Sequence, residues 1–311
     1  MNVLKSLLLG GAVLIFCYSG MAQNVEDDFF RLTKQKSGHY TFSASINNIE
    51  ETDIMLESGI HVMLIDSTFA FNNHELLNLS PTANDKTEKM NLGGKIYRIT
   101  HKAKGKLNIG RNTSYQGEIF ILSDYAKNRT YNIAIPIQNL YNSKDRSSRI
   151  VKLDLNNLFI KMISRKTLKQ EEWEAKVKMN LDTYLNMPAV RTDLKIIDGV
   201  KERRLNGNFN IDLGNASFIF LFNKSKRIQE FLMANSDMKM QKAYNKKKEV
   251  VAEAIVAKEC QLLNLQFDNS VIAITKQLNR FTTEGCIGLK FLEKTVAVFD
   301  FDKSRLYLKR N

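Results

Sequence analysis

Two acidic residues, Glu57 and Asp212, stand in similar short motifs, one in each half of the chain. Each acid is followed two positions later by a glycine, Gly59 in the first half and Gly214 in the second. A glycine at that place lets other backbone approach closely. Carboxyl groups can do acid–base chemistry, and two of them held about 3 Å apart share one proton, because both cannot ionise at that distance. The two motifs are therefore candidates for an acid–base site.

Other residue types offer weaker candidates for chemistry. The histidines show no metal-ligand spacing such as H-E-x-x-H, which favours surface or sheet-edge positions over a metal site. No G-x-S-x-G motif occurs, and neither Cys260 nor Cys286 has a histidine at an interpretable spacing, so a nucleophilic hydrolase is unsupported. No phosphate-binding loop or dinucleotide fingerprint is complete, and the sequence predicts neither a metal nor a cofactor. The four histidines are His39, His61, His74 and His101.

The segments around the two motifs are similar, which indicates an internal repeat. In each half, two strands joined by a turn (Asn47-Asn48 and Asp198-Gly199) run directly into the acidic triplet, and an apolar run follows. A second hydrophobic element then comes at a nearly equal distance along the chain, and each half closes on a hairpin. Four elements in the same order argue against chance similarity. They span residues 40–57, 60–65, 135–140 and 151–160 in the first half and 190–212, 218–222, 287–292 and 296–308 in the second.

Most segments are typical of short strands, so we expect a mainly β protein with two similar lobes. The exception is residues 223–242, whose apolar positions at helical spacing predict one amphipathic helix in the second lobe. A charged connector, residues 165–178, separates the halves, and we expect its Trp173 to pack across the lobe boundary. With that boundary near residue 170, the predicted lobes are residues 23–170 and 171–311.

The composition is that of an ordinary globular protein. Of the 311 residues, 43% are hydrophobic and 25% are charged, which argues against disorder and allows one large domain or two modest ones. Three cysteines are too few for a disulfide-dense scaffold. The formal net charge of +13 is spread over both halves, with one dense basic run at residues 242–248. Such a run usually lies in a solvated loop, so nucleic acid is not an expected partner, whereas an anionic glycan or a membrane surface stays open.

The first 22 residues are typical of a secretory leader. Lys5 precedes an apolar stretch at residues 7–16, and the small residues Gly20 and Ala22 predict cleavage after Ala22 and export to the periplasm, the cell envelope or the medium. The apolar stretch is too short to span a bilayer, which needs about 20 residues, and no other stretch is long enough. A lipid anchor at Cys17 is a less favoured alternative.

Export also decides the expected state of the two cysteines that the exported chain retains. An oxidising compartment permits a disulfide between Cys260 and Cys286. Nothing in the sequence sets the distance between them, so two free buried thiols are an equal alternative. The oligomeric state is left open as well.

The triplets, the apolar runs and the closing hairpins together resemble the bilobal aspartic peptidases, and in particular exported bacterial proteins of the retropepsin-like and pepsin-like group. The second half carries the better match, in residues 209–217 and 285–292, and the resemblance covers residues 38–309. It implies two β-barrel lobes related by a pseudo-twofold axis, with a cleft between them that binds extended polypeptide. It also implies that Asp212 and Glu57 form a catalytic pair, in which one carboxylate activates water and one carboxylic acid polarises the peptide carbonyl.

Three departures from the family pattern touch the implied site. The family motif is Asp-Thr/Ser-Gly, whereas Glu57 carries an extra methylene, and a displacement of about 1 Å can slow catalysis about 100-fold. Ser58 keeps the hydroxyl that buttresses the paired turns, but Leu213 cannot supply the matching one. Pro136 stands where the second half has Gly288, and proline removes a backbone donor. These departures favour a catalytically impaired relative over an active endopeptidase, and the alternative is a non-catalytic peptide- or glycan-binding envelope protein.

Residues 91–99 lie where the first lobe of this family carries a hairpin that covers the substrate. Gly93 and Gly94 suit the turn of such a hairpin, and Tyr97 could lean over a bound peptide. An ordinary β-turn with an exposed tyrosine is the alternative. Asp66 also lies near the first triplet, but no glycine follows it two positions later, so Glu57 remains the predicted match.

Overall fold

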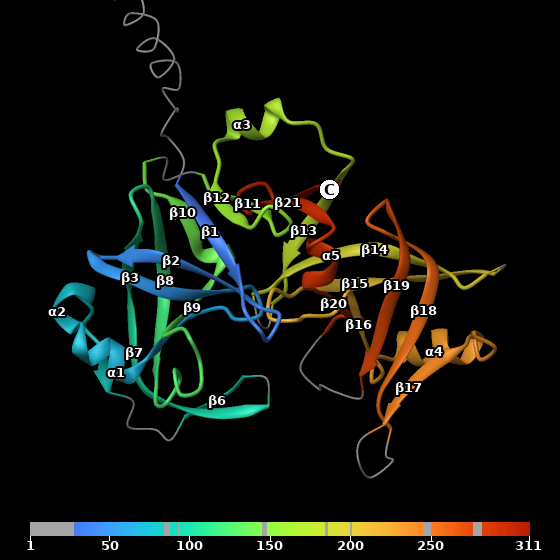
Figure 1. The fold of residues 1–311 in the computed structure, drawn as a ribbon, viewed down its shortest axis with the longest axis horizontal. Coiled ribbons are helices and arrows are strands. Elements are labelled where there is room, and N and C mark those ends of the chain that lie inside the picture. The colour runs from blue at the N-terminus through green and yellow to red at the C-terminus, as the bar shows by residue number, and fades with distance from the viewer. Residues whose placement is uncertain are drawn as a thin grey trace, which may run out of the picture.

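The computed structural model is built mainly of β-strands, which form two lobes side by side with a few short helices (Figure 1). This arrangement confirms the predicted fold class. The predicted leader, residues 1–22, falls outside the described part of the chain. The structure describes residues 28–83, 88–92, 94–144, 148–183, 186–199, 201–244, 250–275 and 282–311.

Among the described residues, the first half of the chain forms β1 to β12, and two short helices lie on the outer side of its lobe (Figure 1). The strands are β1 (Phe29–Lys34), β2 (Tyr40–Ile46), β3 (Ile49–Glu57), β4 (Met63–Asp66), β5 (Thr82–Ala83), β6 (Lys89–Leu92), β7 (Lys95–Ile109), β8 (Thr113–Leu122), β9 (Ile133–Pro136), β10 (Leu140–Asn142), β11 (Ile150–Asp154) and β12 (Phe159–Met162). The helices are α1 (Ser67–Asn72) and α2 (His74–Leu77), and a single 3₁₀ turn, η1, covers Ile137–Asn139.

The second half begins after the short helix α3 (Arg165–Gln170), whose C-terminal end coincides with the predicted lobe boundary. Its strands are β13 (Ala175–Leu181), β14 (Pro188–Ile197), β15 (Glu202–Ile211), β16 (Ile219–Phe222), β17 (Met240–Tyr244), β18 (Val250–Leu262), β19 (Leu265–Thr275), β20 (Gly285–Ile287), β21 (Thr295–Asp300) and β22 (Arg305–Arg310). Its helices are α4 (Lys226–Ala234) and α5 (Leu289–Leu292).

Tight turns set the strand register at the places that the sequence predicts. Asn47 and Asn48 have φ angles of 46° and 71°, which asparagine tolerates better than most residues, and they join β2 to β3 with Ile46 opposite Ile49. In the second half, Gly199 has a φ of 133°, a conformation that favours glycine, and follows the end of β14. Each turn therefore starts the strand that ends at one of the two acids.

The two halves repeat the same strand pairings. In the first, β3 runs parallel to β9, β9 is antiparallel to β4, and β4 runs parallel to β8. In the second, β15 runs parallel to β20, β20 is antiparallel to β16, and β16 runs parallel to β19. Leu56 lies opposite Ile135 just as Ile211 lies opposite Ile287. Glu57 follows Leu56 and Asp212 follows Ile211, so the repeat places the two acids at equivalent positions.

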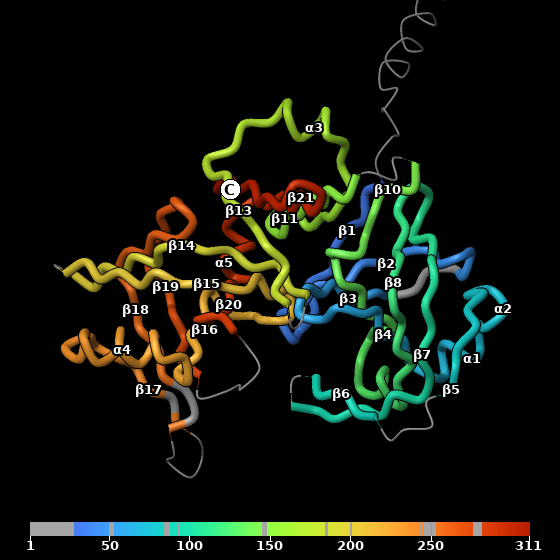
Figure 2. Tube along the Cα trace, turned by 180° about the vertical axis from the view of Figure 1, so that it is seen from behind, coloured from blue at the N-terminus to red at the C-terminus, as the bar shows by residue number. Residues whose placement is uncertain are grey.

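A six-stranded sheet joins the lobes on the side away from β6 (Figure 2). Its order is β1–β12–β11–β21–β22–β13, so each half of the chain supplies three strands. At its centre, β11 pairs antiparallel with β21, from Ile150 opposite Asp300 to Asp154 opposite Val296. Because backbone hydrogen bonds cross from one half to the other, this sheet holds the two lobes at a defined angle.

The predicted helix at residues 223–242 is wrong in its length. α4 spans only Lys226–Ala234, and the side chain of Asn235 donates to the carbonyl of Phe231 at its end. The chain then turns and enters β17, which pairs with β18. The apolar residues beyond the helix, such as Met238, are buried in the core of the sheet. A strand partner supplied by distant sequence therefore overrides the helical spacing at this end.

Trp173 packs across the two halves, as predicted. Its ring lies 6.0 Å from that of Tyr307, and its indole N–H donates to the carbonyl of Leu168 at 3.3 Å. Both rings pack on a small buried cluster that includes Ile163 of the first half and Val298 of the second. The segment that the sequence indicates as a charged connector is therefore ordered as α3 and the beginning of β13.

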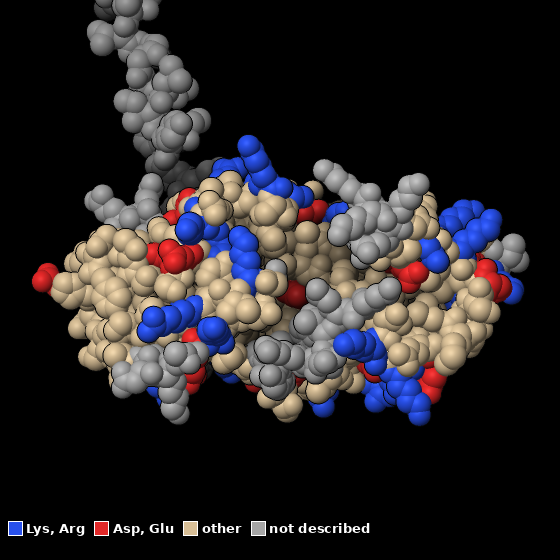
Figure 3. All heavy atoms as spheres, turned by 90° about the horizontal axis from the view of Figure 1, so that it is seen from below, with Lys and Arg blue, Asp and Glu red and all other residues tan. Residues whose placement is uncertain are grey.

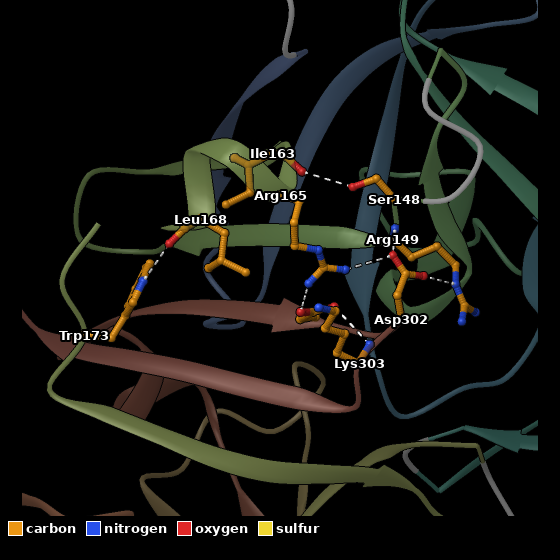
Figure 4. A network of polar contacts seen from close by, with 9 residues as sticks. Ser148, Arg149, Ile163, Arg165, Leu168, Trp173, Asp302 and Lys303 are labelled. Carbon is orange, nitrogen blue, oxygen red and sulfur yellow. Dashed lines mark hydrogen bonds and ion pairs between the residues drawn. The ribbon is translucent and has the colours of Figure 1, made fainter. Parts of the chain in front are cut away.

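Polar contacts beside this cluster tie α3 to the β21–β22 turn (Figure 4). Arg165 forms an ion pair with Asp300, whose side chain is fully buried, and lies 3.5 Å from Asp302. Arg149 pairs with Asp302 at 3.1 Å, but its own side chain is 44% exposed. The backbone N–H of Lys303 donates to Asp300 at 3.1 Å. The buried carboxyl of Asp300 thus depends on Arg165 for its charged partner.

Replacing Arg165 should loosen the junction between the halves. Arg165→Met leaves the buried carboxyl of Asp300 without its guanidinium, and we expect the free energy of unfolding to fall by about 2 kcal/mol. Arg149→Met is the matched control and should lower it by less than about 1 kcal/mol, because that pair is solvated. Denaturant unfolding of both variants measures the difference. Equal losses would contradict the role given to Asp300, and adding Asp300→Asn to Arg165→Met should recover part of the loss.

Candidate active site

The backbone brings the two predicted acids to the same place in each lobe. Glu57 is the last residue of β3 and lies level with Pro136 of β9. Asp212 comes directly after β15, and its N–H donates to the carbonyl of Ile287 in β20 at 2.9 Å. Each acid therefore stands where a strand leaves its sheet beside a parallel neighbour.

The carboxyls of Glu57 and Asp212 meet over the two glycines. Asp212 Oδ1 lies 3.0 Å, and Glu57 Oε2 lies 3.5 Å, from the point where a Cβ on Gly59 would stand. Glu57 Oε1 lies 2.6 Å from the equivalent point on Gly214, so a side chain there would collide with the carboxyl. A side chain at either glycine would therefore displace the carboxyl that lies over it. The structure thus brings together the two residues that the sequence singles out.

Backbone N–H groups turn each carboxyl toward its partner. The N–H groups of Ser58 and Gly59 both donate to Glu57 Oε2 at 3.2 Å. The N–H of Gly214 donates to Asp212 Oδ1 at 2.9 Å. The extra methylene of Glu57 is accommodated because its side chain folds back over its own turn and against Gly214.

The hydroxyl of Ser58 joins the two turns. It donates to the carbonyl of Ile211 at 2.8 Å and accepts the N–H of Leu213 at 2.9 Å. Ser58 is fully buried, so both hydrogen bonds are shielded from water. The side chain of Leu213 lies in the hydrophobic core and supplies no return hydrogen bond. Of the two side chains at this position of the triplets, only Ser58 makes hydrogen bonds between the turns, as the sequence predicts.

Pro136 and Gly288 occupy equivalent positions with different packing. A Cβ on Gly288 would stand 2.4 Å from the carbonyl oxygen of Ser217 and 2.5 Å from that of Asn215, so this position admits only glycine. Pro136 has φ −72° and ψ 124°, which proline adopts without strain, and it begins η1. The predicted departure at Pro136 is therefore compatible with the local backbone.

Two contacts that the sequence analysis missed support the turns. The amide of Gln138 donates to the carbonyls of Ile60 at 2.7 Å and of Asn186, in the second half, at 3.1 Å. The ring nitrogen Nε2 of His39 lies 2.9 Å from the carbonyl oxygen of Gly214. His39 is therefore a contact between the lobes rather than an isolated surface histidine. No local motif marks either residue, because both partners lie far away in the chain.

Burial raises the pKa of both acids. Loss of solvent raises the pKa of Glu57 most, the charge of Asp212 raises it further, and the N–H groups of Gly59 and Ser58 oppose the shift. Burial also raises the pKa of Asp212, whereas the N–H of Gly214 and the charge of His39 lower it. These causes favour a pair that retains one proton over two ionised carboxyls.

The hairpin of β6 and β7 forms as predicted, with Met90 opposite Tyr97. Tyr97 is only 7% exposed, so the alternative of an exposed tyrosine is wrong. Its ring packs edge-on against Tyr125 at 5.7 Å, within a cluster that also contains Ile60. The hairpin therefore rests on the residues that follow the first acidic triplet.

The side chain of Asp66 has a structural role. Its carboxyl accepts the N–H of Thr68 at 2.9 Å at the start of α1, and its second oxygen accepts the N–H of Ala126 at 2.9 Å. This supports Glu57 as the match in the first triplet. The same contacts tie the segment between β8 and β9 to the end of β4.

Cys260 and Cys286 are free thiols, which decides between the two predicted alternatives. Cys286 lies in β20, and Cys260 lies in β18. Burial raises the pKa of Cys260 to about 12. Burial also raises the pKa of Cys286, and the charge of Asp212 adds to the shift. A high thiol pKa leaves little reactive thiolate at neutral pH.

The molecule is hollowed between its lobes when seen from the side of β6, and acidic side-chain atoms lie at the bottom of the hollow (Figure 3).

Within the described ranges, no group of three or more His, Cys, Asp or Glu side chains lies together as a metal site would require. No helix in the same part of the chain is long and apolar enough to cross a membrane.

Comparison with solved structures identifies the fold. An aspartic proteinase from Irpex lacteus aligns with a TM-score of 0.55 over 92% of this chain and 97% of its own, at 8% identity. Basic 7S globulin from soybean aligns with a TM-score of 0.55 over 91% and 95%, at 9% identity. No family model and no curated protein matches the sequence. The chain thus has the pepsin-like fold of aspartic peptidases, and one of these two neighbours is described as a proteinase while the other is a globulin.

Removing the hydroxyl of Ser58 should uncouple the two turns. Ser58→Ala leaves a buried N–H and a buried carbonyl without a partner, so we expect the free energy of unfolding to fall by about 2 kcal/mol. Ser217→Ala is the control, because its hydroxyl is buried without a partner among the described residues, and it should change stability by less than about 0.5 kcal/mol. Thermal and denaturant unfolding measure both. A loss of similar size in the two variants would refute the bridging role.

The raised pKa of Glu57 should make the fold less stable as pH rises. A carboxyl that binds its proton more tightly when folded lowers the free energy of unfolding as pH rises from its ordinary pKa, about 4.3, toward its raised value in the fold. Glu57→Gln should therefore be more stable than the unmodified protein at pH 7 and should flatten the pH profile. Glu118→Gln, at an exposed position, should leave the profile unchanged. An unchanged slope in Glu57→Gln would show that Glu57 is ionised in the fold.

Proposed function

We propose that this chain is an exported protein of the aspartic-peptidase type that binds extended polypeptide between its lobes and hydrolyses it slowly. The observation that carries the proposal is the meeting of the Glu57 and Asp212 carboxyl oxygens within 3.5 Å of a single point above Gly59. The charge of Asp212 adds to the burial that raises the pKa of Glu57, which favours a pair that retains one proton, the state that metal-free peptide hydrolysis needs. Export rests on the leader-like residues 1–22.

In the proposed reaction, one carboxyl acts as base and the other as acid. The Asp212 carboxylate removes a proton from a water molecule, and the water oxygen forms a bond to the carbonyl carbon of the peptide. Glu57 gives its proton to the carbonyl oxygen, which yields a neutral tetrahedral diol. The carbon–nitrogen bond then breaks, the nitrogen takes the proton held by Asp212, and a diol proton returns to Glu57. Each carboxyl ends in its starting state.

Two features of the site make slow turnover the expected rate. The turn of Asp212 lacks a side-chain hydroxyl at Leu213, so Ser58 alone joins the turns and a displaced carboxyl meets less resistance. Glu57 is also one methylene longer than the aspartate of the family motif, so its carboxyl group is displaced relative to that of an aspartate. A misplacement of about 1 Å can reduce the rate about 100-fold.

A second candidate, a binding protein without catalysis, is favoured by the same asymmetry of the turns. It would use the hollow between the lobes for peptide or glycan and would require neither acid. The two candidates differ in one respect that can be measured: only the first predicts that a peptide bond is broken. Cleavage that depends on Asp212 therefore distinguishes the first candidate from the second.

We expect weak, pepstatin-sensitive cleavage of a denatured protein substrate, with its maximum on the acidic side of neutral. Activity requires one proton on the pair, so it should fall at low pH, where Asp212 is protonated, and at high pH, where Glu57 loses its proton. Asp212→Asn should reduce the rate at least 100-fold. Mass spectrometry of the products between pH 3 and pH 8 measures both effects.

Two controls accompany this assay. Asp193→Asn, on the β14–β15 hairpin away from the pair, should retain the full rate. Saturable binding of the same unfolded chain should persist in Asp212→Asn. Unchanged cleavage in Asp212→Asn would remove this residue from the mechanism. Binding without any cleavage by the unmodified protein would decide for the second candidate.

A further inference from the structure

The guanidinium of Arg129 lies among three tyrosine rings beside the candidate active site. Its central carbon is 4.3 Å from the ring centre of Tyr125, 4.9 Å from that of Tyr97 and 5.7 Å from that of Tyr131. Tyr97 and Tyr125 are both buried, at 7% and 3% exposure. Cations are attracted to aromatic faces, most strongly where water is excluded.

The backbone fixes this guanidinium in place. Arg129 belongs to the segment between β8 and β9, and its N–H donates to the carbonyl of Ala126 at 2.9 Å. The N–H of Ala126 in turn donates to Asp66, which is 5% exposed. The side chain itself donates to the carbonyl of Tyr125. Arg129 is therefore held by the end of β4 and does not swing freely as most surface arginines do.

Arg129 has no carboxylate partner among the described residues. None of the ion pairs between described side chains includes it. Arg129 is half-buried. An arginine held by aromatic rings, with donors left over, is well suited to a bidentate bond with a carboxylate.

The guanidinium also lies within electrostatic reach of the acid pair. The charge of Arg129 lowers the pKa of Glu57 as a minor cause beside burial and Asp212. After burial, the charge of Glu57 is among the causes that raise the pKa of Tyr131. One of the three tyrosines, Tyr97, belongs to the hairpin of β6 and β7, which extends toward the second lobe (Figure 2). Tyr97 and Tyr125 pack in one cluster with Ile60, which follows the first acidic triplet, so Arg129 lies beside the turn that carries Glu57.

We propose that Arg129 makes this cleft selective for polypeptides with an acidic side chain at the position that lies against the first lobe. The proposal rests on the proposed function, because it requires a polypeptide in the cleft. Without Arg129, a glutamate at this position would be repelled by the negative charge on Asp212 and would lose its hydration. The guanidinium offsets both effects, and the surrounding rings strengthen its bond to the carboxylate by excluding water.

Paired peptides test this selectivity. Each pair shares one fluorescently labelled sequence of about ten residues and differs only by glutamate or glutamine at one position, which is moved along the peptide, with amidated and free C-termini compared. Fluorescence anisotropy with the full chain measures the dissociation constants. We expect one position at which glutamate binds about tenfold more tightly than glutamine, which corresponds to one charge-assisted hydrogen bond. This preference should shrink as ionic strength rises.

Variants then assign the preference to Arg129. Arg129→Met should bring the glutamate-to-glutamine ratio to about one, and Arg129→Lys should leave part of it, because lysine keeps the charge and loses the planar fork. Lys127→Met, which removes an exposed charge from the same segment, should keep the full preference. Circular dichroism melting shows whether each variant is folded. The glutamate-to-glutamine ratio of the unmodified protein tests the proposal even if a variant does not fold.

Several outcomes would overturn the proposal. Equal binding of glutamate and glutamine peptides at every position contradicts it, as does a preference that survives in folded Arg129→Met. A preference that follows only the free C-terminus also overturns it, since the carboxylate would then be terminal. If no peptide binds the unmodified protein at all, the proposed function itself fails, which is a different result from binding without charge selectivity.

Discussion

Two half-buried carboxyl groups that lie against each other set the requirements for the rest of this structure. Removal from solvent favours the neutral form of each acid, and the charge of Asp212 makes ionisation of Glu57 harder still. A proton can be shared only if the turns that carry the acids come into contact, and each acid lies over a glycine, where a side chain would displace the carboxyl. The repeated strand pairings place one turn in each lobe, and the six-stranded sheet between the lobes holds the two turns against each other.

The two turns meet symmetrically in their backbone and asymmetrically in their side chains. The strand pairings around Glu57 and Asp212 are the same, but only Ser58 crosses between the turns, because Leu213 points into the core. Gln138 and His39 add contacts across the lobes that the repeat itself does not contain. The amide of Gln138 and the ring of His39 thus hold the two halves together near the turns, while Ser58 makes the hydrogen bonds between the turns themselves.

The surroundings of the pair differ between the lobes as well. On the first-lobe side, tyrosines and Arg129 form a wall with a positive charge, and Asp66 holds the segment that carries them. A guanidinium near a buried acid pair changes what can approach it, since it attracts carboxylates that the pair alone would repel. The fold is therefore shared with an aspartic proteinase, while the surroundings of the acid pair are set by the side chains of this chain.

The class of fold, the repeat and the two acids were predictable from the sequence, because each depends on a local signal: alternation along a strand, asparagine or glycine in a turn, and glycine two positions after an acid. The length of α4 was not, since Met240–Tyr244 finds its strand partner in β18. Nor were the free thiols, the burial of Tyr97 or the positions of Gln138, His39 and Arg129. All of these depend on contacts between residues far apart in the chain. By itself the sequence determined which residues could do chemistry and in what order the elements occur. Only the tertiary structure decided which side chains meet, because that depends on how the two halves pack and on what their packing excludes from water.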